Sequence, residues 1–142
     1  MSAATSVAVA VVFVWLGMVL AISFLEAPLK FRAPEVTLRI GLGIGRLVFR
    51  ALNAVEAVFA VTVVVMMLIR TRDAATVLLL LAVVVLVVQL LAVRPRLTRR
   101  SDEVLRGHEG GRSHAHIGYV AFETAKVALL LVGGILLMTG TS

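Results

Sequence analysis

The sequence predicts an all-α integral membrane protein, a single-domain four-helix bundle whose helices all cross the bilayer. Of the 142 residues, 61% are hydrophobic, and the mean hydropathy is +1.06, well above the range of soluble globular domains. The apolar residues gather in four segments, each long enough for the about 20 residues that a membrane-spanning helix needs. The chain has no cysteine, which excludes disulfides, thiolate metal sites and cysteine nucleophiles.

The first two helices are predicted at about 7–27 and 36–69. Residues 1–25 carry no charged side chain and no basic stretch precedes the apolar run, so we expect an uncleaved helix and not a signal peptide. The second helix is longer than one span requires. Its beginning, which includes "RIGLGIGR", is therefore expected to lie at the membrane interface.

The last two helices are predicted at about 74–93 and 116–138. Gln89 is the only strongly polar residue of the third helix. The stretch "RTRDAAT" before it predicts a tight turn, whereas "RPRLTRRSDEVLRGHEGGRS" after it is the one long loop. Because proline cannot continue the backbone hydrogen bonding of a helix, three prolines are expected to mark the ends of the first and third helices. These are Pro28, Pro34 and Pro95.

The distribution of basic residues predicts the orientation in the membrane. Nine of them lie in the first and third loops, whereas the second loop has only Arg70 and Arg72. By the positive-inside rule, the first and third loops face the cytoplasm and both termini face outward, in a cell (inner) membrane. Because the net charge of +6 is concentrated in these short loops, the lipid bilayer is the expected partner and nucleic acid is not. An inverted or dual topology is the alternative.

Ten polar or ionisable residues lie within or at the edge of the four predicted spans. A charged side chain at the bilayer centre costs about 2.5–3.5 kcal/mol, so such residues persist where they pair or line a wet cavity. Three acids and three bases are among them, so the set is able to neutralise itself. The predicted ligand-binding residues are Glu26, Arg46, Arg50, Asn53, Glu56, Gln89, His116, Tyr119, Glu123 and Lys126.

The helical repeat places the polar residues of the second helix on one face and those of the fourth helix on another. At matching depths, Glu56 is expected to pair with Lys126. In the same way, Arg50 is expected to pair with Glu123. These pairs predict a charged pocket, open to the cytoplasm above an apolar floor, in which Arg46 and Arg50 hold a small anionic or amphipathic ligand. The predicted function is the binding or transport of a small solute or ion. The alternative is a structural membrane subunit whose charges only hold its helices together.

Two shorter motifs have competing interpretations. In "GLGIG", the spacing of Gly41 and Gly45 predicts close helix packing; no Lys-Ser/Thr follows, so it is not a phosphate loop. The stretch "HEGGRSHAH" offers imidazoles, which bind copper, zinc or nickel. Its predicted metal ligands are His108, His114 and His116, and a solvated interfacial loop is the alternative.

Three stretches follow one another along most of the chain: "SFLEAPLKFRAPEVTLRIGLGIGRLVFR", "LLAVRPRLTRR" and "HAHIGYVAFETAKVALLL". Their order resembles a family of small four-helix membrane proteins of unknown function, which includes transmembrane protein 205 and bacterial relatives and is similar to the copper-resistance D proteins. The family's landmarks fall on Ala27 and Pro28, on Arg94 and Pro95, and on His116. The resemblance implies a link to metal or drug resistance. The chain departs from the family in the additional charges of its second and fourth helices.

The stretch "RALNAVE" is similar to the second helix of the glutathione-handling membrane enzymes of eicosanoid metabolism, in which an Asn-x-x-Glu grips glutathione. Asn53 and Glu56 have that spacing, whereas Arg50 is one residue too close to Asn53. This resemblance implies the rival function, a membrane enzyme that uses glutathione or a redox or metal cofactor. The sequence itself specifies no cofactor, and it is compatible with a homo-oligomer.

Overall fold

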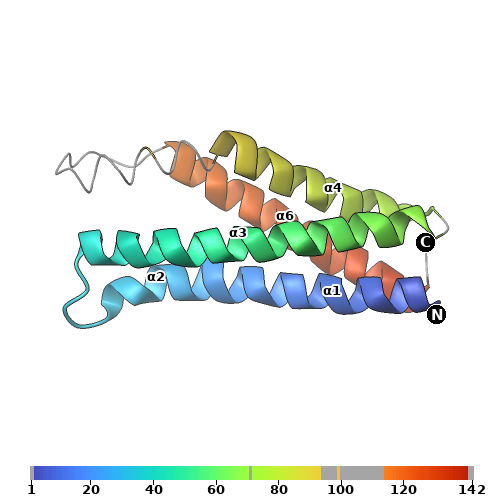
Figure 1. The fold of residues 1–142 in the computed structure, drawn as a ribbon, viewed down its shortest axis with the longest axis horizontal. Coiled ribbons are helices and arrows are strands. Elements are labelled where there is room, and N and C mark those ends of the chain that lie inside the picture. The colour runs from blue at the N-terminus through green and yellow to red at the C-terminus, as the bar shows by residue number, and fades with distance from the viewer. Residues whose placement is uncertain (1, 71, 94–98, 100–113, 141–142) are drawn as a thin grey trace.

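The computed structural model describes residues 2–70, 72–93, 99 and 114–140 of the chain. It confirms the all-α fold class, because these residues form four long helices and no strands. The helices alternate in direction along the long axis of the molecule, and both chain ends lie at the same end of the bundle (Figure 1). We call this the terminal end. The opposite end, which carries Lys30, Arg32 and Arg39, we call the basic end.

The helical segments are α1 (Ala3–Val19), α2 (Ala27–Leu29), α3 (Leu38–Leu68), α4 (Ala74–Val88) and α6 (His114–Thr139). π-Helical turns at Leu20–Glu26 join α1 to α2, and a second π-helical stretch, Gln89–Val93, continues α4. Among the described residues, four helices are long and apolar enough to cross a membrane: Ala3–Arg32, Leu38–Leu68, Ala74–Leu91 and Ile117–Thr139. These four helices fit a multi-pass integral membrane protein.

The first helix runs beyond its predicted end, because Pro28 lies inside it. A proline lacks the backbone N–H and crowds the carbonyl four residues earlier. The π-helical stretch before it makes room, since the N–H of Ala27 donates to the carbonyl of Ile22, five residues back. The helix ends at Ala33, whose extended backbone is the conformation favoured before a proline. Pro34, and not Pro28, therefore marks the end of this helix.

Three of the long helices begin with a side-chain cap. The caps are Ser2, Thr37 and Asp73, and each accepts a hydrogen bond from the backbone N–H three residues later. Such caps satisfy backbone donors that have no partner within the helix. At Asp73 the cap is reciprocal, because the hydroxyl of Thr76 accepts from the backbone N–H of Asp73 at 3.4 Å.

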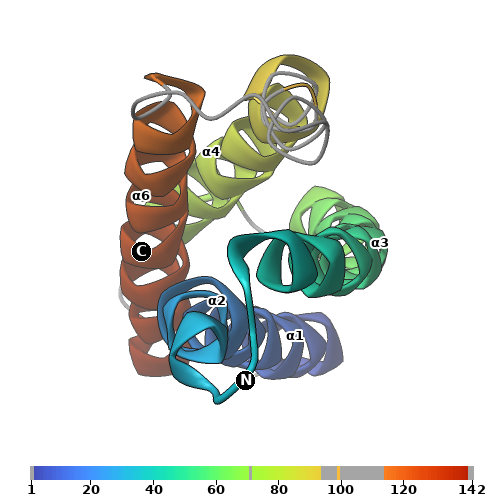
Figure 2. The same cartoon turned by 90° about the vertical axis from the view of Figure 1, so that its left-hand side faces the viewer.

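The bundle packs unevenly around its core. α4 packs chiefly against α6, and α1 packs against both α3 and α6, whereas α3 and α4 are less closely packed. Figure 2, which looks along the bundle, shows α3 standing apart from α4 on one side. The core is aliphatic apart from one tryptophan and one methionine. Its most buried members are Ala8, Val12, Trp15, Val19, Val63, Met67, Ala75, Leu79, Ala82 and Leu130.

Glycines allow close packing at two places, one of which is the predicted packing motif of Gly41 and Gly45. A Cβ atom at Gly133 would lie 2.6 Å from Cδ2 of Leu79, so this glycine brings α6 against α4. A Cβ atom at Gly41 would lie within 3 Å of three ring atoms of Phe31, and one at Gly45 would lie 2.9 Å from Nζ of Lys30. The "GLGIG" motif therefore packs α3 against the end of the first helix.

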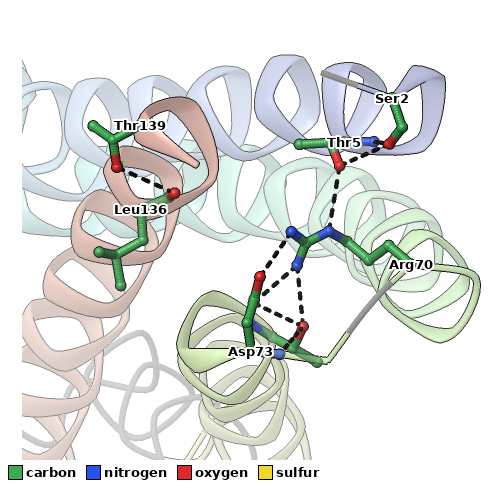
Figure 3. Close-up of polar contacts among 7 residues, drawn as sticks. Ser2, Thr5, Arg70, Asp73, Leu136 and Thr139 are labelled. Carbon is green, nitrogen blue, oxygen red and sulfur yellow. Dashed lines mark hydrogen bonds and ion pairs between the residues drawn. The ribbon is translucent and has the colours of Figure 1, made fainter. Parts of the chain in front are cut away.

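The short turn between α3 and α4 is tied to the beginning of α1. Arg70 forms two parallel hydrogen bonds of 2.9 Å to the carboxylate of Asp73, and it donates from Nε to the hydroxyl of Thr5 at 3.3 Å (Figure 3). A fourth hydrogen bond goes from Arg70 Nη1 to the hydroxyl of Thr76 at 3.2 Å. We call Thr5, Arg70, Asp73 and Thr76 the terminal clasp, because they connect α1, α3 and α4 at the terminal end.

Candidate functional site

A network of five buried polar side chains lies inside the bundle, and all four long helices contribute to it. The members of this buried polar network are Trp15 of α1, Glu56 of α3, Gln89 at the end of α4, and Glu123 and Lys126 of α6. Trp15 is fully buried, and the other four side chains belong to residues that are 1–2% exposed. In a membrane protein, ionisable groups at such a depth are the first candidates for a functional site.

Lys126 is the centre of the buried polar network. Its ammonium donates to Oε1 of Glu56 at 2.8 Å and to Oε1 of Gln89 at 2.9 Å, and it lies 2.6 Å from Oε1 of Glu123. An ammonium has three protons, so all three are used. The predicted pair of Glu56 with Lys126 is thereby confirmed. The sequence predicts this pair correctly because Glu56 and Lys126 lie at the same depth on facing helices.

The two carboxylates differ in what they accept. Oε1 of Glu56 also receives the indole N–H of Trp15 at 3.2 Å, and Oε1 of Glu123 receives the amide of Gln89 at 2.8 Å. Oε2 of Glu123 is buried and has no hydrogen-bond partner among the described residues. A buried oxygen of this kind carries a desolvation cost of about 1–3 kcal/mol or more, so it calls for an explanation.

The network is not balanced in charge. Two carboxylates surround one ammonium, so one negative charge is left over when all three groups are ionised. Removing an ion from water costs several kcal/mol even after relaxation, and the partners present here compensate only one of the two acids. A single additional positive charge would make the buried polar network neutral.

The predicted pair of Arg50 with Glu123 is wrong. Glu123 pairs with Lys126 instead, and Arg50 is exposed on α3. At about 100° per residue, Arg50 lies about 120° around the helix from Glu56, which turns it away from the network. The expected balance of three acids against three bases is therefore replaced by two acids against one base.

The space between the carboxylates is closed. The predicted pocket open to the cytoplasm would expose Glu56 and Glu123, but the side chains of Gln89 and Lys126 fill the gap between them. Asn53 is half-buried one turn from Glu56. Because Glu56 is already bound to Trp15 and Lys126, the Asn-x-x-Glu spacing does not present a free carboxylate to a ligand.

A second group of polar residues, the entrance cluster, lies nearer the basic end. Its members are Ser23, Glu26, Lys30, Phe49 and Tyr119. The hydroxyls of Ser23 and Tyr119 lie 3.5 Å apart and join the first helix to α6. The ring of Tyr119 stands edge-on to that of Phe49, with centroids 5.7 Å apart, and Nζ of Lys30 lies 5.7 Å from the Phe49 centroid.

Glu26 forms the outer part of the entrance cluster. Its side chain is 35% exposed, yet Oε2 is buried and has no hydrogen-bond partner among the described residues. Nζ of Lys30 lies 3.8 Å from this oxygen, which is an ion pair but too long for a hydrogen bond. Arg46, half-buried on α3, follows Gly45, whose Cα faces the ammonium of Lys30.

An apolar groove of about 310 Å³ runs between α3 and α4. Its lining consists only of alanine, valine and leucine: Ala57, Ala60, Val61, Val64, Val65, Val83, Leu86, Val87 and Leu90. The groove follows from the loose packing of these two helices. It offers no polar group to orient a charged solute, so it does not form the predicted ligand pocket.

The predicted histidine metal site stays a prediction. His108 lies outside the described residues, and so do the side chains of His114 and His116. Pro95, which is predicted to mark the end of the third helix, also lies outside them. Within the described part of the chain, no three His, Cys, Asp or Glu side chains come together as a metal site would require.

Four members of the two groups are not among the residues predicted from the sequence: Trp15, Ser23, Lys30 and Phe49. Trp15 is the only tryptophan of the chain, and a buried indole N–H needs an acceptor. This requirement for an acceptor indicates from the sequence alone that Trp15 has a polar partner inside the bundle. Ser23 is a weaker indication, because it is only a single hydroxyl within an apolar segment. The sequence places Lys30 in a loop, because Pro28 predicts the end of the helix before it.

No protein-family model, curated protein or solved structure matches the chain at a significant level. The two family resemblances therefore remain expectations, and the function has to be argued from the site alone.

Proposed function

We propose that the chain is a small-ion transport protein of the membrane that carries protons, with the buried polar network as its proton-binding site. The observation that supports this function is the unpartnered, buried Oε2 of Glu123 in a network with one uncompensated negative charge. A proton bound there removes the excess charge without adding an ion that needs its own coordination shell.

The chemistry of the network favours a proton over other small ions. A metal cation would lie close to the Lys126 ammonium, which is only 2.6 Å from Glu123 and 2.8 Å from Glu56. An anion would meet the same two carboxylates. The predicted anion-binding Arg50 does not join the network, because its side chain is exposed. The anionic ligand expected from the sequence is therefore not part of this proposal.

The side from which protons reach the network follows from the predicted orientation. We propose that the basic end faces the cytoplasm, as the nine basic loop residues indicate. The core between the network and the terminal end consists of side chains such as Val12, Leu130 and Met67, which offer a proton no hydrogen-bonded route. Transport then requires a second state in which the terminal half opens.

A structural role is the second candidate, and one observation favours it. The network takes at least one side chain from every long helix, so it also fixes how the helices sit against one another. A substitution of Glu123 distinguishes proton transport from a purely structural role. In Glu123→Gln, the retained carbonyl still accepts from Lys126, while the site for an additional proton is removed.

The test is proton flux into liposomes that contain the purified chain and a pH-sensitive dye, driven by a potassium gradient and valinomycin. We expect the wild type to exceed protein-free liposomes, and Glu123→Gln to be slower by about tenfold or more. Glu35→Gln is the matched control, because Glu35 is an exposed carboxylate outside the bundle, and it should leave the flux unchanged. If the wild type does not exceed empty liposomes, or if Glu123→Gln keeps its flux, proton transport is refuted and the structural role replaces it.

A further inference from the structure

We infer that protons reach Glu123 from the basic end along a route formed by Glu26, the hydroxyl pair of Ser23 and Tyr119, and Glu123 itself. This inference rests on the proposed function, and it adds the path and the residues that conduct. It assigns a role to the entrance cluster, which the binding site alone does not use.

Two buried carboxylate oxygens without a hydrogen-bond partner mark the two ends of this route. One is Oε2 of Glu26, whose side chain still reaches solvent, and the other is Oε2 of Glu123, which is sealed inside the bundle. Among the described residues, these are the only buried side-chain oxygens or nitrogens left without a partner. An acceptor without a donor is the place where an arriving proton binds.

The hydroxyl pair lies between these two ends. Ser23 lies three residues before Glu26 in the first helix, and Tyr119 lies four residues before Glu123 in α6, so Tyr119 and Glu123 share a face of α6. The 3.5 Å contact of the two hydroxyls bridges the helices, and either oxygen can be the donor. This freedom lets the pair pass a proton in either direction.

The backbone around Ser23 and Glu26 supports their assignment to the proton route. Ser23 and Glu26 both lie in the π-helical stretch Leu20–Glu26, a conformation that occurs frequently at functional sites. The Lys30 ammonium, held between the rings of Phe31 and Phe49, stays beside Glu26. This ion pair holds the Glu26 carboxylate at the outer end of the route.

The transfer balances in atoms and charge. Tyr119 gives its hydroxyl proton to Oε2 of Glu123 and takes one from Ser23, which takes one in turn from Glu26. Every O–H bond that breaks is replaced by another, no electrons move, and the net change is one proton shifted from Glu26 to Glu123. We propose that the first step, from Glu26 to Ser23, and the last step, from Tyr119 to Glu123, each pass through one bridging water molecule.

The charged and titratable groups around the route come from every helix packed against it. Glu123 is bound to Lys126 on α6 and to Gln89 at the end of α4. Glu56 on α3, which accepts from Trp15 on α1, is bound to the same ammonium, and Tyr119 lies about one turn before Glu123 on α6. At the outer end, Glu26 is paired with Lys30 on its own helix, and Arg46 is half-buried on α3 beside Gly45, which lies next to the Lys30 ammonium. Uptake of the proton changes the charge next to Lys126 and Glu56, and Glu56 is bound to Trp15.

Trp15 provides the readout, because it is the only tryptophan of the chain. In a stopped-flow pH jump on the purified protein in detergent, its fluorescence should change as the network takes up a proton. In Tyr119→Phe, which keeps the ring but removes the hydroxyl, we expect the same amplitude at a rate lower by about tenfold or more. Ser23→Ala should slow the response in the same way. The matched control is Thr124→Val, which removes an α6 hydroxyl that is exposed and bonded to its own helix.

The outcomes separate the route from the proposed function. Glu123→Gln should lose the amplitude; if it keeps the wild-type amplitude, the function itself fails. If Glu123→Gln loses the amplitude while Tyr119→Phe and Ser23→Ala both respond at the wild-type rate, the function stands and the route is wrong. A response slowed equally in Thr124→Val also refutes the route, because the effect would then come from any hydroxyl of α6.

Discussion

Lys126 contributes more to the bundle than its single charge suggests. Its three donated protons hold two carboxylates and an amide from three different helices around one point. Removing it leaves Glu56 and Glu123 as two buried carboxylates without a cation. Removing one acid instead leaves one carboxylate against one ammonium, a balanced pair. The acids and the base of the network are therefore not equivalent.

Lys126→Met is expected to destabilise the protein by about 3–5 kcal/mol, the cost of breaking a buried ion pair from one side. Glu56→Gln should cost clearly less, because it leaves a neutral network. The double variant should be more stable than Lys126→Met alone. Thermal melting in detergent measures all three, and equal melting temperatures for Lys126→Met and Glu56→Gln would contradict the charge argument.

At the scale of elements, α6 owes its position to its glycines. Gly133 faces Leu79 of α4, and Gly134 lies where a Cβ would be 3.0–3.1 Å from Phe13 and Val12 of α1. Gly118, on the same helix, has open space around its Cα. An added methyl group is therefore expected to lower the stability of the bundle at Gly133 and to raise it at Gly118. The gain in helix propensity is the same at both positions.

Gly133→Ala should destabilise the bundle by about 1–3 kcal/mol, because overpacking against Leu79 outweighs the gain in helix propensity. Gly118→Ala should stabilise it by up to about 1 kcal/mol, since only the propensity changes. Thermal melting of the two variants tests the packing directly. The same sign of shift in both would show that α6 does not approach α4 as closely as described.

The turn between α3 and α4 is expected to respond to acid. The hydrogen bonds from Arg70 lower the pKa of Asp73 from 3.8 to about 2. Because the folded pKa is the lower one, the stabilisation is complete above about pH 4 and is lost as the pH falls through about 2. The loss should be roughly 1 kcal/mol after allowance for solvent screening. Melting between pH 5 and pH 2 measures it, and Asp73→Asn should remove this part of the pH dependence; an unchanged profile would contradict it.

For the whole molecule, the two ends of the bundle differ in charge. The terminal end has Arg70 and Arg72, and Arg70 is neutralised by Asp73 in the terminal clasp. Lys30, Arg32 and Arg39 lie at the basic end. Both termini lie at the end with fewer basic residues (Figure 1). The structure thus places the basic residues of the first loop at one end of the bundle and those of the turn between α3 and α4 at the other end. The positive-inside rule requires such a separation.

A reporter that is active only in the cytoplasm should therefore be inactive when fused after Ser142, and active when inserted in the 94–113 loop. A periplasmic or extracellular reporter should give the reverse pattern. Activity of the cytoplasmic reporter at both positions would indicate dual topology, and activity only after Ser142 would invert the proposed orientation.

The fold and half of the site could be predicted from the sequence, for different reasons. Hydropathy fixes the number of spans, and depth along facing helices predicts the contact of Glu56 with Lys126. Depth alone does not fix rotation, which is why Arg50 was wrongly paired with Glu123. The first helix was cut short at Pro28, because a π-helical turn that accommodates a proline leaves no pattern in hydropathy. The closing of the pocket by Gln89 depends on side-chain packing, which spacing does not describe.

The length of α3 has a consequence for how the protein sits in lipid. Its 31 residues span about 46 Å at 1.5 Å per residue, against a hydrocarbon core of about 30 Å. To fit entirely, the helix would have to tilt by about 50°, beyond the about 40° that membrane helices reach. Its first ten or so residues, which include Arg39 and Arg46, therefore project into the headgroup layer. With the basic end facing the cytoplasm, as proposed above, each basic side chain there would gain about 1 kcal/mol from anionic headgroups, which would anchor this end. Hydrophobic mismatch in a thinner or thicker bilayer must then be absorbed at the opposite end, where the terminal clasp lies.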